Sequence, residues 1–140
     1  MGNSNQKVIG IDLGTEYCCV ATFENKSLKV IPNKRKNLLT PSYVSFTENG
    51  LLFGEDAKEQ AHLNPTNTVY DVKRLIGRRF DDPLLKFDID THWLFEVVGD
   101  GQGKPKIKVV HDGEQRAYYA EEISGFLLGY LKETAQNYVL

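Results

Sequence analysis

The sequence predicts an α/β fold, and three observations carry that prediction. Short β-rich runs joined by glycine-containing turns fill the amino-terminal third, a second group of such runs follows later, and the last segment, Glu121–Tyr138, has helical periodicity. We expect a mixed sheet built on an amino-terminal β-hairpin, with a smaller α+β subdomain between Pro41 and about Glu121. At 140 residues, 41% hydrophobic and 26% charged, the chain has the size of one globular domain or of a piece of one.

The first two runs predict the hairpin. Val8–Asp12 and Cys18–Glu24 are rich in β-formers, and the short polar segment Leu13–Tyr17 between them contains Gly14, which permits a tight turn. Leu28–Ile31 is a third predicted strand. The adjacent Cys18 and Cys19 would leave an extended strand on opposite faces, so we expect reduced thiols that act as small apolar side chains.

The segment after these strands is basic and rich in turn residues. Pro32–Asn37 contains Lys34, Arg35 and Lys36, which we interpret as a solvated loop. Further strands are predicted at Tyr43–Phe46 and, behind the Asn49-Gly50 turn signal, at Leu51–Phe53.

Two helices are predicted next. The segment Glu55–Ala61 has strong helix formers with acids in its first turn. A second helix would be capped by Thr68 and ended by Gly77, with Lys73 beside its apolar face. Its apolar residues have the three-and-four spacing of a buried stripe: Val69, Val72, Leu75 and Ile76.

The remaining runs predict a small antiparallel sheet followed by the long helix. The sheet comprises Phe95–Val98, Lys106–Val110 and Gln115–Tyr119, joined by glycine-bearing turns. In the helix Glu121–Tyr138, one stripe is apolar: Ile123, Phe126, Leu127, Tyr130 and Leu131. No stop signal precedes Leu140, and we expect the carboxyl end to be interrupted rather than completed.

Composition argues against several classes of partner. The net charge is −2 and both signs are interspersed, so we expect no nucleic-acid partner and no membrane partner. The start, 1–7, is polar, which predicts a disordered tail without a signal-peptide core and, most simply, a cytoplasmic protein. His62, His92 and His111 have no partner at ligand spacing, so we expect no metal site built from them.

The hairpin turn is the first candidate for chemistry. Asp12 stands at a strand end beside Gly14 and Thr15, where backbone N–H groups and one hydroxyl can converge on a phosphate. The Asp12 carboxylate is an oxygen ligand of the kind Mg²⁺ prefers, and that ion usually neutralises a nucleotide. The motif by itself is a weak signal and is more often an ordinary hairpin turn.

Four ordered blocks resemble the seventy-kilodalton heat-shock chaperones of the DnaK type. They are Ile9–Thr15 followed by Tyr17, Thr40–Phe46, Asn64–Pro65 with Asn67–Asp71, and Lys73–Arg78. Later pieces resemble the small lobe subdomain and the helix after it: Trp93 with Phe95, Glu121–Ser124 and Leu131–Ala135. The resemblance runs from about Val8 to Leu140 and implies the amino-terminal part of a nucleotide-binding domain, a partial lobe of the actin-like ATPase, ribonuclease H-like fold.

The resemblance also implies ATP or ADP and Mg²⁺ as cofactors. Asp12 would lie near the Mg²⁺, the loop residues Gly14, Thr15, Glu16 and Tyr17 at the phosphates, and Lys73 at the terminal phosphate or the attacking water. A lysine there suits phosphoryl transfer, which depends on positioning and charge stabilisation. Glu16 departs from the family's second threonine. A carboxylate about 4 Å from a phosphate costs on the order of 1–4 kcal/mol unless it turns outward or Mg²⁺ intervenes.

We therefore expect an ATP-binding segment of a chaperone that drives protein folding, too incomplete to turn over ATP alone. Nucleotide, co-chaperones and nucleotide-exchange factors are the implied partners, and unfolded clients would bind only through a separate domain. One alternative is a non-catalytic interaction module derived from this lobe, which Glu16 favours. A sugar kinase or actin-like protein shares the Asp-x-Gly-Thr turn but does not account for Lys73–Arg78.

Overall fold

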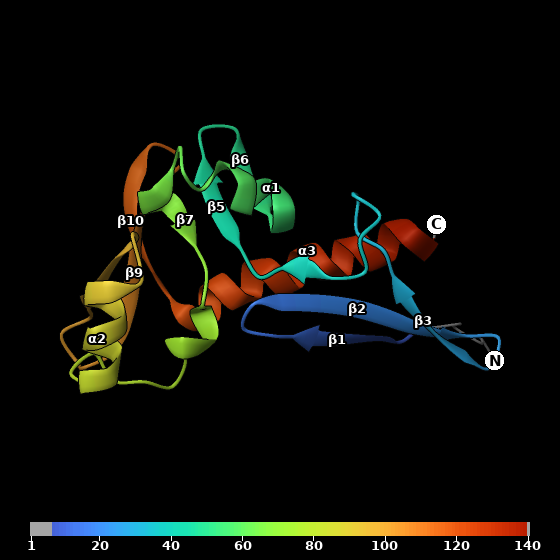
Figure 1. Cartoon of the computed structure of the whole chain (residues 1–140), viewed down its shortest axis with the longest axis horizontal. Helices are drawn as coiled ribbons and strands as arrows, with labels where there is room; N and C mark the ends of the chain where they lie inside the picture. Colours follow the sequence, from blue (N-terminus) through green and yellow to red (C-terminus); the bar gives the residue numbers. More distant parts are fainter. Residues whose placement is uncertain (1–6, 140) are drawn as a thin grey trace, which may run out of the picture.

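The computed structural model describes residues 7–139, which form three antiparallel sheets and three α-helices (Figure 1). The strands are β1 (Ile9–Leu13), β2 (Tyr17–Glu24), β3 (Ser27–Ile31), β4 (Thr40–Pro41), β5 (Val44–Thr47), β6 (Gly50–Phe53), β7 (Thr68–Val69), β8 (Glu96–Gly99), β9 (Pro105–His111) and β10 (Glu114–Tyr119). The helices are α1 (Gly54–Gln60), α2 (Pro83–Thr91) and α3 (Ala120–Val139), with 3₁₀ turns η1 (Pro65–Asn67) and η2 (Val72–Arg74).

The amino-terminal sheet confirms the predicted hairpin. β1 pairs with β2 from Ile9↔Thr22 to Leu13↔Cys18, and β2 also pairs with β3 and β4. Cys18 is buried and Cys19 is half-buried, and both are free thiols, as expected from alternation along a strand. Burial raises the pKa of the Cys18 thiol to about 11, so it is protonated at neutral pH and packs as an apolar group.

Helix α3 contacts all three sheets, and the prediction of a long helix is confirmed. Its buried stripe includes Ile123, Leu127, Leu131 and Ala135. Ala135 packs with Val20 and Ile31 of the amino-terminal sheet, whereas the earlier positions belong to a larger core that joins Cys18 of β2 to the other two sheets. In Figure 1 the helix therefore runs from the β9 and β10 end of the molecule to the β1–β3 end.

The other two sheets share one core with the first half of α3. They have the orders β6-β5-β7 and β10-β9-β8, which confirms the predicted small antiparallel sheet. Phe46 on β5 stacks on Tyr118 of β10 with ring centroids 5.6 Å apart, and Trp93 stacks on Phe95 at 5.3 Å. Every strand pair among residues 7–139 is antiparallel, so the mixture of parallel and antiparallel pairs that we expected is not found in this part of the chain.

The helix predicted between Thr68 and Gly77 is wrong. Thr68–Val69 is a short strand on β5, and only the single turn η2 follows. Thr68 does not cap a helix, because its hydroxyl donates to the Asn64 carbonyl oxygen at 2.8 Å. Asp71 has φ 56°, a left-handed conformation that interrupts a helix.

The burial of this segment agrees with the predicted stripe only in part. Val69 and Leu75 are buried, but Ile76 is 42% exposed.

Helix α2 was not predicted, although its start carries recognisable signals. Asp82 accepts a hydrogen bond from the Leu84 N–H at 2.9 Å, and Pro83 occupies the first helical turn.

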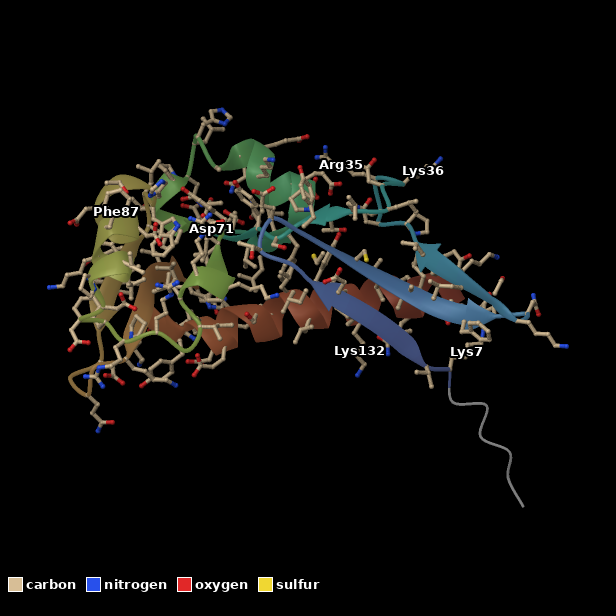
Figure 2. All side chains as sticks on the ribbon, turned by 60° about the horizontal axis from the view of Figure 1, so that its bottom comes forward. Lys7, Arg35, Lys36, Asp71, Phe87 and Lys132 are labelled. Carbon is tan, nitrogen blue, oxygen red and sulfur yellow. The ribbon has the colours of Figure 1, made fainter. Side chains whose placement is uncertain are left out.

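The basic loop is exposed, as we expected, and it also forms ion pairs that we did not predict. Arg35 donates to Asp56 and to both oxygens of Glu59 on α1, and Lys34 also pairs with Asp56. Both cations hold the pKa of the Asp56 carboxyl below its ordinary value, Lys34 more strongly than Arg35. Figure 2 shows Arg35 beside α1, whereas Lys36 is exposed at the edge of the molecule.

The tail predicted over 1–7 lies outside the described residues except for Lys7. Lys7 is exposed, and its Nζ lies 3.7 Å from Glu24 Oε1. Within residues 7–139, no helix combines the length and the apolar character needed to cross a membrane.

Candidate functional site

The turn between β1 and β2 has room only for glycine at its centre. A Cβ atom built on Gly14 would lie 2.2 Å from the carbonyl oxygen of Tyr17, far inside van der Waals contact. The absence of a side chain therefore lets the loop close on itself. This is the arrangement in which glycine permits close approach of the backbone.

Ser42 fastens this loop to the segment between β4 and β5. Its Oγ donates to the Gly14 carbonyl oxygen at 2.9 Å, and its N–H donates to the Glu16 carbonyl oxygen at 2.9 Å. The side chain is buried, so both bonds are shielded from water. Sequence reasoning gave Ser42 no role in the site; the only signal was its place in the Thr40-Pro41-Ser42 run.

Lys73 lies in the single 3₁₀ turn η2, and contacts of the neighbouring residues position that turn. The Tyr70 hydroxyl donates to the His92 carbonyl oxygen at 2.9 Å, and Trp93 Nε1 donates to Asp71 Oδ2 at 3.3 Å. These bonds fix the position of Asp71, the left-handed residue before η2. The turn η2 is closed by a hydrogen bond from the Arg74 N–H to the Asp71 carbonyl oxygen at 2.9 Å. Lys73 is exposed, and no carboxylate of residues 7–139 lies within ion-pairing distance of its Nζ.

The structure brings Gly14, Thr15 and Lys73 together around one small cavity. Its remaining lining residues are Leu13, Ser42, Val44, Val72, Ile123, Ser124 and Leu127. The volume of about 10 Å³ has room for roughly one water-sized group. The cavity is therefore too small to enclose a phosphate.

The other predicted site residues do not line this cavity. Asp12 and Glu16 are exposed, and neither carboxylate has an ion-pair or hydrogen-bond partner in the described part of the chain. Tyr17 is 44% exposed and lines a separate pocket with Lys58. Ser124 belongs to the cavity but was not predicted, because a helical serine in an apolar stripe carries no sequence signal of its own.

The donor set fits a nucleotide-bound Mg²⁺ better than a metal site built from protein ligands alone. No group of three or more His, Cys, Asp or Glu side chains within residues 7–139 could hold a metal ion. Asp12 supplies one free carboxylate at the end of β1. Mg²⁺ at nucleotide sites commonly takes one or two carboxylates, with phosphates and waters completing its shell.

Comparison with known proteins identifies the family. A family model described as Hsp70 protein matches residues 8–140. The chain belongs to the Hsp70 family. The α/β architecture with several sheets fits the actin-like lobe of that family, and the resemblance of the four sequence blocks is thereby confirmed.

Several chaperones resemble this Hsp70-family chain along most of its length. A heat shock protein of Pyricularia oryzae is 52% identical over 91% of the chain, and a ribosome-associated molecular chaperone of Eremothecium gossypii is 51% identical over 91%. Heat shock 70 kDa protein 2 of Paracoccidioides lutzii is 47% identical over 94%. The chain spans 20% of the length of each of these three relatives.

Proposed function

We propose that this chain is the phosphate-binding lobe of an ATP-driven molecular chaperone. The observation that carries the proposal is the shared cavity of Gly14, Thr15 and Lys73, which come from two distant parts of the sequence. Membership of the Hsp70 family supports ATP or ADP as the ligand. The same membership supports co-chaperones and nucleotide-exchange factors as partners, client binding through a separate domain, and a cytoplasmic location.

Each residue has a distinct task in this proposal. The N–H groups of the Gly14–Tyr17 loop and the Thr15 hydroxyl donate to phosphate oxygens, as in other backbone nests. Lys73 offsets charge on the terminal phosphate or orients the attacking water. Asp12 holds the Mg²⁺ directly or through water, and when bound that ion neutralises the phosphates.

Calorimetric titration with Mg²⁺-ADP tests this assignment. Asp12→Ala is expected to weaken binding because it removes the carboxylate assigned to the metal. Glu16→Thr is expected to strengthen binding about tenfold, since it removes a negative charge near the phosphates. Binding to the native state must also raise the melting temperature. A parent chain and a Glu16→Thr variant that both show neither heat nor a thermal shift would contradict the proposal.

The 140-residue chain by itself is expected to turn over little or no ATP. The described residues supply one wall of a phosphate site, whereas phosphoryl transfer requires charge stabilisation on all sides of the phosphate. Phosphate release measured with Mg²⁺-ATP should therefore stay near the rate without protein, for the parent and for Lys73→Ala alike. Clear turnover that Lys73→Ala abolishes would show that this expectation is wrong.

Glu16 favours a second candidate, a non-catalytic interaction module. An exposed carboxylate in the phosphate loop opposes nucleotide binding by its charge. In that case the lobe would serve as a surface for co-chaperones or exchange factors. The titration separates the two candidates. The interaction module requires that the parent binds no nucleotide, whether Glu16→Thr restores binding or neither protein binds.

A further inference from the structure

The carboxylate of Asp71 is held by the indole of Trp93, which comes from a distant segment. Trp93 Nε1 donates to Asp71 Oδ2 at 3.3 Å, and the two residues are 22 positions apart in the sequence. The indole is 6% exposed and stacks on Phe95, with ring centroids 5.3 Å apart. The core therefore fixes the donor, and burial shields it from competing water. We call this contact the Trp93–Asp71 bond.

Asp71 lies where the chain enters η2. Its φ of 56° is left-handed, a conformation that Asp and Asn tolerate better than most residues with side chains. Its carbonyl oxygen accepts from the Arg74 N–H at 2.9 Å, so the same residue also closes the turn that carries Lys73. Lys73 lines the cavity of Gly14 and Thr15. The direction in which Lys73 leaves the turn therefore depends on the backbone of Asp71.

The Trp93–Asp71 bond is the contact that acts on this left-handed residue itself. The Tyr70 hydroxyl, bonded to the His92 carbonyl oxygen at 2.9 Å, joins the same two segments but lies before the change of direction. The guanidinium of Arg74 lies 3.9 Å from a carboxylate of α2, and such a half-exposed pair contributes little. Contact between η2 and α3 holds the turn near the helix, but apolar packing is not directional. A hydrogen bond is.

We propose that Asp71 and Trp93 are positioning residues that act through Lys73 on the terminal phosphate of ATP. This inference rests on the proposed function, in which Lys73 reaches that phosphate. ADP lacks the terminal phosphate, so the Trp93–Asp71 bond governs the preference for ATP over ADP rather than nucleotide affinity as a whole. Because the attraction between charges falls with distance, a loosened turn weakens the effect of Lys73 without removing its charge.

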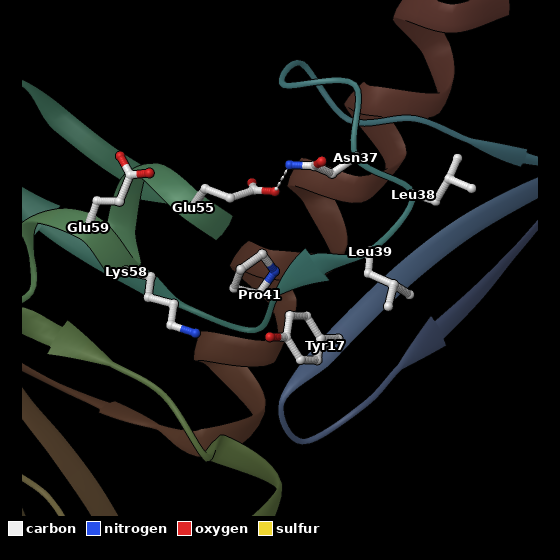
Figure 3. A pocket seen from close by; sticks show the side chains of 8 residues that line it. All are labelled: Tyr17, Asn37, Leu38, Leu39, Pro41, Glu55, Lys58 and Glu59. Carbon is white, nitrogen blue, oxygen red and sulfur yellow. Dashed lines mark hydrogen bonds between the residues drawn. The ribbon is translucent and has the colours of Figure 1, made fainter.

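A second lysine near the phosphate loop provides the matched control. Lys58 on α1 lines a different pocket with Tyr17 and Pro41, and Figure 3 shows its side chain directed toward Tyr17. Its Nζ lies 5.8 Å from the centroid of that ring. Lys58 does not line the cavity of Thr15 and Lys73. Lys58→Ala therefore removes a cation of the same chemistry and should leave the preference for ATP within about twofold of the parent's.

Calorimetric titration of the 140-residue chain with Mg²⁺-ATP and with Mg²⁺-ADP tests the proposal. Lys73→Ala is expected to lower the ratio of ATP affinity to ADP affinity about tenfold. Asp71→Gly permits the same backbone conformation without an acceptor, and Trp93→Phe keeps an aromatic ring without a donor, so each should lower the ratio about fivefold. Asp71→Asn keeps the acceptor and should retain the ratio. Asp71→Gly/Lys73→Ala should match Lys73→Ala, because no ammonium is left to position.

NMR tests the bond without nucleotide. Trp93 is the single tryptophan, so its indole N–H gives one signal. Exchange of that N–H with solvent should be slow in the parent and in Asp71→Asn, and faster in Asp71→Gly. The heteronuclear NOE of the Lys73 backbone amide should fall in Asp71→Gly and in Trp93→Phe, which reports increased fast motion of the turn. Thermal melts report whether every variant remains folded.

The outcomes separate positioning from a role in folding alone. The proposal is overturned if Asp71→Gly and Trp93→Phe weaken both nucleotides equally, if they keep the parent's ratio, or if Lys58→Ala lowers the ratio as much as Lys73→Ala does. A parent that binds neither nucleotide contradicts the proposed function, and the NMR result then decides the positioning role. An unchanged Lys73 NOE overturns that role, and a lowered one supports it.

Discussion

Replacing Phe46 with alanine is expected to lower the free energy of unfolding by about 3–5 kcal/mol. The ring is 1% exposed and lies within 5.1 Å of the His111 ring, 5.6 Å of Tyr118 and 6.1 Å of Phe126, measured between centroids. Its removal leaves a cavity that these rings cannot fill without leaving their own contacts. Urea unfolding followed by the fluorescence of Trp93, the single tryptophan, measures the loss.

Phe23→Ala is the matched control for this prediction. Phe23 is 68% exposed on the amino-terminal sheet, so its truncation removes few contacts and should change the free energy of unfolding by no more than about 0.5 kcal/mol. Equal losses for the two variants would mean that the aromatic cluster does not hold the sheets together. An unchanged dependence on urea concentration in both would show that unfolding still exposes the same surface.

The expected size of the Phe46 effect follows from where the ring lies. It joins β5 to the β9-β10 hairpin and α3, which lie about sixty residues or more further along the sequence. Ser42 precedes β5, and Ser124 lies on α3. The core that this ring completes therefore also positions two walls of the candidate phosphate cavity, and a loosened core should weaken the site together with the fold.

Local pattern was sufficient where an element satisfies its own hydrogen bonds. The β1-β2 hairpin follows from two β-rich runs around Gly14, and α3 follows from its apolar stripe, because neither depends on a distant partner to choose its conformation. The turn at Gly50, with φ 103°, likewise follows from the Asn49-Gly50 pair.

The local sequence pattern gave the wrong prediction where contacts with distant residues determine the backbone conformation. Val69, Val72 and Leu75 have helical spacing, yet Thr68–Val69 pairs with β5 as a strand. Asp71 adopts a left-handed backbone conformation, and its carboxylate accepts a hydrogen bond from Trp93. The competing tertiary contacts outweigh a weak helical preference. Helix α2 was missed for the opposite reason, since its nine residues bury only Leu85 and so show no regular apolar stripe.

Only some residues of the candidate site could likewise be proposed from local sequence pattern. Gly14 and Thr15 could be proposed from their position at a strand end, but no sequence spacing connects them with Lys73. That pairing came only from family resemblance, and the fold now brings the residues to one cavity. Ser42 was missed because its role is to bond to the loop rather than to a ligand. The ion pairs of Lys34 and Arg35 with α1 were missed because they too join distant segments.

Gly14→Ala is expected to weaken Mg²⁺-ADP binding by at least about tenfold and to lower the free energy of unfolding by about 1–3 kcal/mol. A Cβ at this position would lie 2.2 Å from the Tyr17 carbonyl oxygen, so the loop backbone must open. Opening would break the bonds from Ser42 to the loop and displace the N–H groups that are assigned to the phosphate. Calorimetry and thermal melts of the variant measure the two effects separately.

Gly10→Ala, four residues earlier on the same hairpin, isolates the steric cause. A Cβ at Gly10 would meet nothing within 4 Å, so this variant should bind nucleotide like the parent and should be no less stable. If both variants bind normally, the loop N–H groups do not hold the phosphates, and the assignment of the site fails. If Gly14→Ala loses stability while the parent itself binds no nucleotide, the tight loop serves the fold alone. The lobe is then better explained as an interaction module.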